Sequence, residues 1–201
     1  GNDLWPRHAR GQALTNLEFI LRHEPTFPGC RKLFVLNRFV DPVAQARAER
    51  MVKAQGHDCL ILPFVAADYA AVTLDTTCFG GDAHFLSAEF AASGSAAQHT
   101  QRLWAAAPKL RYAMNVNGAR NAALDYGATH GDWTLLLDGS CFVSADAWRV
   151  LWAALTARPF APYLVIPMQR LVRNEAALTT TPRPNRSEEP QLGFHASALA
   201  R

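Results

Sequence analysis

The chain has 201 residues, of which 49% are hydrophobic and 18% charged, and its formal net charge is +3. These values are typical of one ordinary globular domain, and a mild charge without a clustered basic stripe gives no reason to expect nucleic acid as a partner. No run of about 20 apolar residues occurs, so we expect no membrane span, while the slight positive charge is compatible with anionic substrates or a peripheral membrane contact.

The cysteines and the N-terminus indicate a cytoplasmic protein. Cys30, Cys59, Cys78 and Cys141 form no C-x-x-C pair, and no histidine spacing completes a zinc site, so we expect reduced thiols. The first eleven residues have no apolar stretch of the kind found in signal peptides. Because the chain begins with Gly and ends abruptly at Arg201, we expect the natural protein to be longer.

The first half of the chain predicts a parallel strand–helix–strand unit. Residues 1–30 are expected to form an N-terminal extension with a short amphipathic helix, packed on a single domain at residues 31–201. Lys32–Asn37 and Cys59–Phe64 are apolar segments typical of buried strands. Val43–Gln55 between them has the apolar spacing of a helix. Apolar strands joined by a helix favour a parallel, right-handed unit.

Two later segments carry few structural signals. Asp68–Arg111 is rich in small residues and is interrupted by Gly80, Gly81 and Gly94, so we expect a largely irregular loop with one short helix. Thr179–Pro190 is a loop rich in proline and threonine. The segment before it, 164–168, is expected to be a strand.

The segment 117–127 predicts a helix with a polar face. Good helix formers follow Asn117 and Gly118, with Asn117 as the expected N-cap and Gly127 as the C-terminal stop. Helical spacing places four side chains on one face. These are Asn117, Arg120, Asn121 and Leu124. Because the free N–H groups and the helix dipole also point to the N-terminal end, this face is a favourable place for an anion.

A predicted buried strand follows, and a carboxylate stands directly after it. Trp133–Leu137 is almost wholly apolar and stops at Asp138, Gly139 and Ser140. Open α/β sheets bind their ligands at such carboxyl ends of strands. Ser144 is the expected cap of the following helix.

The combination of an Arg-Asn helix and an apolar strand ending in Asp-x-polar resembles the glycosyltransferase-A (GT-A) superfamily. There the Arg-Asn helix lies beside a nucleotide-sugar, and the strand ends in a D-x-D motif. Arg120 and Asn121 match the helix and Asp138 matches the first Asp, while Ser140 replaces the last one. The resemblance is best over Arg31–Met168. It implies an α/β, Rossmann-like GT-A fold with a mainly parallel central sheet and helices on both faces.

The resemblance also implies an enzyme that moves a sugar from a nucleoside-diphosphate sugar to a hydroxyl of a carbohydrate or lipid acceptor. Asp138 would hold Mg²⁺ or Mn²⁺ against the diphosphate, with His195 as a distant metal ligand. Glu189 would act as the general base toward the acceptor hydroxyl. The expected donor-binding residues are Asn37, Arg38, Asn117, Arg120, Asn121 and Ser140.

Each of these residues also has a purely structural interpretation. Asp138 could make a turn with Gly139, Asn117 could cap its helix, and Glu189 could belong to an acidic pair at a helix start. A lone histidine such as His195 is more often a surface or core residue. Two other functions therefore stay open, namely a sugar nucleotidyltransferase and a non-catalytic nucleotide-sugar-binding or scaffolding domain of a larger protein.

Overall fold

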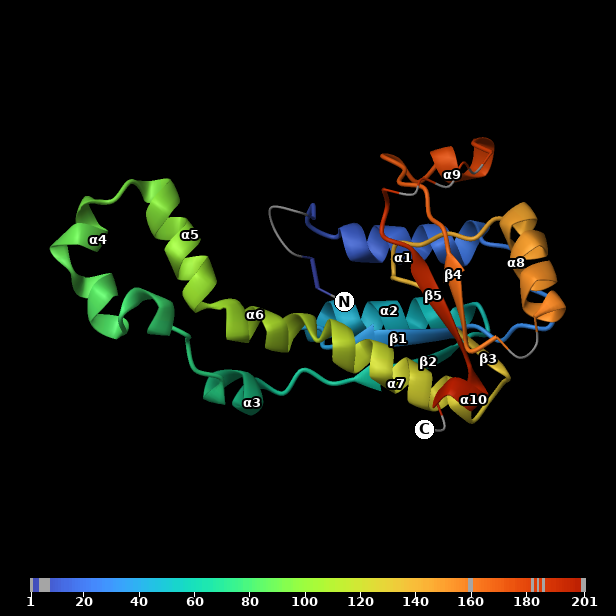
Figure 1. The fold of residues 1–201 in the computed structure, drawn as a ribbon, viewed down its shortest axis with the longest axis horizontal. Helices are drawn as coiled ribbons and strands as arrows, with labels where there is room; N and C mark the ends of the chain where they lie inside the picture. The colour runs from blue at the N-terminus through green and yellow to red at the C-terminus, as the bar shows by residue number, and fades with distance from the viewer. Residues whose placement is uncertain are drawn as a thin grey trace.

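Two small sheets and a helical arm make up the fold (Figure 1). The computed structural model describes residues 2–3, 8–158, 161–181, 183, 185 and 187–199. The strands are β1 Leu33–Asn37, β2 Asp58–Leu62, β3 Trp133–Leu136, β4 Tyr163–Ile166 and β5 Gln191–His195. The helices are α1 Gln12–His23, α2 Pro42–Ala54, α3 Ala66–Ala71, α4 Ala88–Ala92, α5 Ser95–Ala105, α6 Ala107–Met114, α7 Val116–Ala128, α8 Ala145–Ala157, α9 Ala176–Thr179 and α10 Ala196–Leu199, with short 3-10 helices η1 Thr77–Phe79 and η2 Asp82–Leu86.

The predicted parallel pair is confirmed. β1 and β2 pair in parallel, with Leu33 opposite Asp58 and Asn37 opposite Leu62. The connecting helix α2 begins where the Asp41 carboxylate accepts a hydrogen bond from the Val43 N–H at 2.8 Å. Helix α1 packs on α2, and together they bury one core cluster. Its buried members are Leu36, Phe39 and Ala48.

The expected mainly parallel central sheet is wrong. The second sheet has three strands in the order β3-β5-β4, and both of its pairings are antiparallel. Neither β3 nor β4 pairs with β1 or β2 in the described part of the chain. The cause is β5, which follows the proline-rich loop and inserts between β3 and β4. A parallel continuation of the first sheet is thereby replaced by a separate antiparallel one.

Gly193 explains how β5 fits between its neighbours. A Cβ atom at Gly193 would lie 2.6 Å from Leu135 Cδ2 on β3 and 3.6 Å from Leu164 Cβ on β4. The two flanking leucines therefore close over the glycine, and the central strand of this sheet carries almost no side-chain volume there. Glycine weakens a strand on its own, so it marks a close approach rather than a strand preference.

The two faces of β3 meet different helices. Leu135 packs against the second core cluster, which consists of Phe27, Val143 and Trp148 and includes helix α8. The opposite face of β3 lies against α7, where Gly127 approaches Thr134. Helix α8 begins at Ser144, as predicted, because the Ser144 hydroxyl accepts a hydrogen bond from the Ala147 N–H at 3.2 Å.

Helix α7 differs from the prediction at both ends. It starts at Val116, with Asn115 as N-cap, so Asn117 lies inside the first turn and is not the cap. It continues through Gly127 to Ala128, so Gly127 does not stop it. Gly127 is instead a packing position, because a Cβ atom there would lie 2.0 Å from Thr134 Oγ1 and 2.8 Å from Thr134 Cβ.

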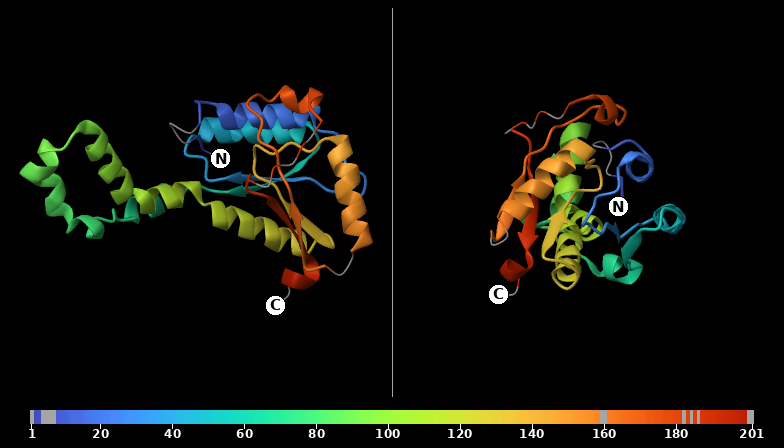
Figure 2. Two further views of the ribbon diagram at one scale, coloured as in Figure 1. Left: turned by 45° about the horizontal axis from the view of Figure 1, so that its top comes forward. Right: turned by 90° about the vertical axis from the view of Figure 1, so that its right-hand side faces the viewer.

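Residues 66–114 form a helical arm that projects from the two sheets, as the two further views in Figure 2 also show. The prediction of a largely irregular segment is therefore wrong. Phe79, His84, Phe85 and Phe90 hold the tip of the arm together, with neighbouring ring centroids 5.1–5.5 Å apart. Short helices fastened by a local aromatic cluster lack the long apolar stripe that reveals a helix in a sequence.

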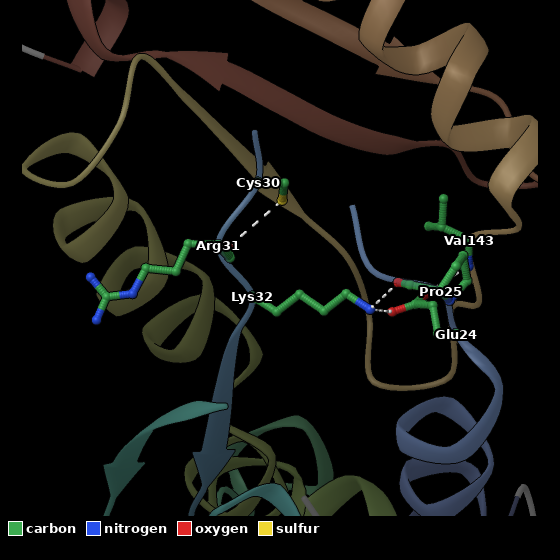
Figure 3. Close-up of polar contacts among 6 residues, drawn as sticks. All are labelled: Glu24, Pro25, Cys30, Arg31, Lys32 and Val143. Atoms are coloured by element: carbon green, nitrogen blue, oxygen red, sulfur yellow. Dashed lines mark hydrogen bonds and ion pairs between the residues drawn. The ribbon is translucent and has the colours of Figure 1, made fainter. Parts of the chain in front are cut away.

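A buried ion pair fastens the N-terminal segment to the entry of β1, and its carboxylate also holds the loop before α8 (Figure 3). Lys32 Nζ, just before β1, lies 2.8 Å from Glu24 Oε2, and these side chains are 15% and 6% exposed. Lys32 also donates to the Pro25 carbonyl at 2.9 Å. The other carboxylate oxygen of Glu24 accepts a hydrogen bond from the Val143 N–H at 2.8 Å. Residues 24–32 are thus an integral part of the packed body.

Among the described residues, none of the helices is long and apolar enough to cross a bilayer.

We expect Lys32→Met to lower the free energy of unfolding by about 3–5 kcal/mol, because it leaves the Glu24 carboxylate buried without its cation. Adding Glu24→Gln should recover part of this loss, since the amide keeps an acceptor for the Val143 N–H. Urea unfolding measures both effects. Lys53→Met is the control, because its pair with Glu49 lies on the surface. Equal losses in Lys32→Met and Lys53→Met would contradict the role given to the buried pair.

We expect Gly127→Ala to destabilise the fold by about 1–2 kcal/mol, although alanine favours helices, because the new methyl overlaps Thr134. Thr134→Ala removes the two closest atoms and should restore much of the loss in the double variant. Thermal unfolding of the wild type, both single variants and the double variant gives the coupling energy. Additive effects would show that α7 does not approach β3 at this point.

Candidate functional site

A cavity of about 210 Å³ lies between helix α7 and strand β5. Leu124, Leu136 and Phe194 supply part of its apolar wall. Polar side chains from two distant parts of the chain complete the lining. These are Asn117, Arg120 and Asn121 from α7, Glu189 from the segment that leads into β5, and Gln191 from the start of β5. The four α7 residues predicted to share one face therefore do so, and that face opens on the cavity.

Asp138 stands at the edge of this group and is held from two sides. Its Oδ1 lies 3.1 Å from Arg120 Nη2, and its Oδ2 lies 3.4 Å from Gln191 Nε2. The Asp138 N–H donates to Gln191 Oε1 at 2.9 Å. Gln191 itself is buried, with 7% exposure. The buried amide thus fixes the carboxylate, and the carboxylate positions the guanidinium at the cavity wall.

The two glutamates before β5 have different surroundings. Glu188 Oε2 accepts a hydrogen bond from Arg170 Nε at 3.0 Å, so this carboxylate is engaged in an ion pair. Glu189 is exposed and lines the cavity. In the described part of the chain, no hydrogen bond or ion pair engages the Glu189 carboxylate. Of the two, Glu189 is therefore the one available to a ligand.

Asn37 and Arg38 do not line this cavity. Asn37 donates to the Met114 carbonyl at 2.7 Å and accepts from Asn115 Nδ2 at 3.0 Å. Arg38 donates to the Tyr112 carbonyl at 2.7 Å, and its guanidinium lies 3.9 Å from the centre of the Tyr112 ring. These contacts tie the end of β1 to the junction of α6 and α7. Both residues have a structural task that accounts for their polar side chains.

Ser140 and His195 are also placed away from the cavity lining. Ser140 is exposed on the turn that follows β3. His195 is the last residue of β5 and pairs with Trp133, at the start of β3. Asp138 lies near the other end, beside Gln191, so about 13 Å of strand separates the two positions. The His195 ring instead contacts Ser197 Oγ at 2.7 Å. The structure does not bring His195 and Asp138 together.

The residues around Asp138 do not fit a Mg²⁺ or Mn²⁺ site. Such an ion is held by one or two carboxylates with substrate phosphates and water. One oxygen of Asp138 faces the Arg120 cation, and the other faces the Gln191 amide. Within the described ranges no group of three or more His, Cys, Asp or Glu side chains could hold a metal ion. A guanidinium therefore occupies the place beside the carboxylate that a metal would need.

The pKa of the Cys141 thiol depends on the charge of Asp138. Burial, followed by the nearby Asp138 carboxylate, raises the pKa of the Cys141 thiol to about 11. The Cys141 N–H donates to the Asp138 carbonyl at 2.8 Å, which fixes the thiol close to the site. At neutral pH this thiol is protonated.

Gln191 is the site residue that the sequence analysis missed. The segment 191–195 was not predicted as a strand, because it has five residues with a glycine at its centre. Its one available signal is the alternation of Leu192 and Phe194, which both line the cavity. Nothing else in the sequence around Gln191 indicates that its side-chain amide is buried.

We expect Asp138→Asn to lower the Cys141 pKa, because it removes the carboxylate that disfavours the thiolate. Burial remains, so the pKa should stay above the ordinary value. The pH dependence of iodoacetamide alkylation at the Cys141 peptide, followed by mass spectrometry, measures this shift. Asp146→Asn, on the exposed first turn of α8, is the control. An unchanged alkylation profile in Asp138→Asn would contradict the arrangement.

No family model, curated protein or solved structure matches this chain. The resemblance to the GT-A superfamily therefore rests on the residues of α7, β3 and the turn after β3.

Proposed function

We propose that the chain is a nucleotide-sugar-dependent glycosyltransferase whose donor sugar occupies the cavity between α7 and β5. One observation supports this proposal. Three residues expected to bind the donor and the residue expected to act as base line the same cavity, although α7 and Glu189 are far apart in sequence. Amides, a guanidinium and a carboxylate above an apolar wall match the hydroxyl groups and the apolar face of a sugar ring.

The diphosphate would lie toward the N-terminal end of α7. A guanidinium has five N–H donors, and the Arg120–Asp138 pair uses one of them. The remaining donors can bind two phosphate oxygens at once. Asn117 lies in the first turn of α7, where the dipole also favours an anion. Asp138 acts here as a positioning residue for Arg120.

Glu189 would take the proton of the acceptor hydroxyl. As this proton moves to the carboxylate, the acceptor oxygen forms a bond to the anomeric carbon. The bond from that carbon to the diphosphate breaks at the same time, and the electron pair leaves with the nucleoside diphosphate. Arg120 would stabilise the charge that grows on this leaving group.

The cavity has room for part of a nucleotide-sugar. Its volume of about 210 Å³ is below the range of roughly 300–1,000 Å³ that is common for sites enclosing drug-sized ligands. We therefore place the sugar ring inside, the diphosphate at its mouth, and the nucleoside on the outer surface.

A module that binds a neutral sugar without turnover is the second candidate. The charge around the cavity favours it, because the Arg120 guanidinium stands against the two carboxylates of Asp138 and Glu189. Two carboxylates and one cation suit hydroxyl groups better than a diphosphate. The two candidates differ in their ligand, since this module would bind free sugars as well as nucleotide-sugars.

We expect one member of a panel of UDP-, GDP-, CDP- and dTDP-sugars, with EDTA present, to raise the thermal stability of the protein. A ligand at one hundred times its dissociation constant stabilises by about 2.7 kcal/mol. Arg120→Met should abolish the shift, because it removes the phosphate donor. The matched control is Arg149→Met, an exposed arginine on α8. Glu189→Gln should keep the shift and lose the release of nucleoside diphosphate in the presence of an acceptor.

Three outcomes would contradict the transferase. No panel member stabilises the wild type, or the shift persists in Arg120→Met, or free sugars give the full shift without a nucleotide. The last outcome identifies the sugar-binding module.

A further inference from the structure

A second cavity, of about 130 Å³, lies on the other side of the strand end that carries Asp138. Leu136 lines the polar cavity, whereas its neighbour Leu137 lines this one. Successive side chains of a strand point to opposite faces, so the end of β3 separates the two cavities. Phe142 also lines the second cavity. The turn at residues 138–141 connects two residues of the wall, Leu137 and Phe142, so both of its ends start at this cavity.

The wall of this second cavity is apolar. Apart from Phe142, its larger members come from β4, α8 and the loop after β4, and include Leu151, Ile166, Met168 and Leu171. Two of its polar side chains are already engaged. The Ser144 hydroxyl caps α8, and Gln169 Oε1 accepts a hydrogen bond from the Arg183 N–H at 2.7 Å. A ligand in this cavity would thus meet hydrocarbon surface.

The surroundings favour an extended chain over a compact ring. An apolar cavity of about 150 Å³ is large enough for a benzene-sized group, so volume alone allows either shape. Leu171 at the wall is 38% exposed, its neighbour Val172 is fully exposed, and Leu178 on α9 is 48% exposed. Val172 directly follows the wall residue Leu171, and Leu178 directly follows the wall residue Ala177, so exposed apolar side chains offer a path out of the cavity. A chain can follow this path, whereas a ring fills the cavity and ends there.

We propose that this second cavity binds the alkyl chain of an amphipathic acceptor, whose hydroxyl then lies at Asp138, on the edge of the polar cavity that Glu189 lines. The acceptor role rests on the proposed transferase, whereas the binding of an alkyl chain does not. The arrangement gives the two substrates opposite sides of one strand end, with the nucleotide-sugar donor on the polar side. It selects, from the carbohydrate and lipid acceptors, those with a hydrocarbon chain.

Titration calorimetry with alkyl glucosides of increasing chain length, each below its micelle-forming concentration, tests the proposal. We expect affinity to rise about fourfold for each methylene that enters the cavity, from about 0.8 kcal/mol per buried CH₂. Methyl glucoside should bind too weakly to measure. Binding of the longer chains should show a negative heat-capacity change, which marks the burial of apolar surface.

Two variants test the cavity, one by filling it and the other by making its wall polar. Ala147→Phe fills it from α8, and Leu171→Asn places an amide in its exposed wall. Each should weaken the binding of hexyl glucoside at least tenfold. Ala153→Phe, exposed on the same helix and outside the cavity lining, is the control and should bind as the wild type does. Because Leu171 is partly exposed, its variant tests the site even if Ala147→Phe does not fold.

The outcomes separate this proposal from the transferase. Equal binding of methyl and hexyl glucoside, or wild-type binding by both cavity variants, would overturn the alkyl site. Tighter binding of phenyl than hexyl glucoside would overturn the alkyl chain in favour of an aromatic ring. Chain-length-dependent binding without transfer from any nucleotide-sugar would support the alkyl site and overturn the transferase.

Discussion

The arrangement of the two sheets depends on the buried pair of Glu24 and Lys32. Burying a carboxylate or an ammonium alone costs several kcal/mol, so each charge requires the other in place. The pair joins the segment after α1 to the entry into β1, and the second oxygen of Glu24 reaches the Val143 N–H before α8. Phe27 packs alongside, since its ring stacks on Trp148 and lies under Lys32 Nζ. No strand pairing links the two sheets in the described part, so these contacts carry much of the connection.

Helix α7 makes the second connection between the two sheets, and its fixed position also shapes the polar cavity. Its N-terminal end is tied to β1, because Asn115 donates to Asn37. Its other end presses on β3, where Gly127 leaves no room beside Thr134. A helix fixed at both ends cannot turn about its axis, so the side of α7 that carries Arg120 must face β5. The polar cavity thus follows from packing positions that touch no ligand.

The sequence predicts those parts of the fold whose signals are local. The unit of β1, α2 and β2 has apolar strands, a capped helix and clear boundaries, and helical spacing alone places Arg120 and Asn121 on one face. The expected parallel sheet was wrong because its order depends on β5, whose pairing partners lie about 25 to 60 residues away. The sequence of a short strand with a central glycine does not indicate which strands it pairs with. The packing of Leu135 and Leu164 over Gly193 forms only when the three strands come together. Gln191 could not be predicted for the same reason, because its role depends on the hydrogen bonds that it forms with Asp138 in the folded chain.

The Arg120–Asp138 pair determines which charges a ligand of the polar cavity meets at its wall. A surface pair of this kind contributes little to stability, and with side chains 39% and 48% exposed it is not needed to hold the fold. Gln191, by contrast, is buried and bonds both the backbone and the carboxylate of Asp138. A buried amide that fixes an exposed ion pair orders a charged group without strengthening the core. Such an arrangement keeps the guanidinium at the wall in one orientation, and an incoming ligand then meets donors that need no further ordering.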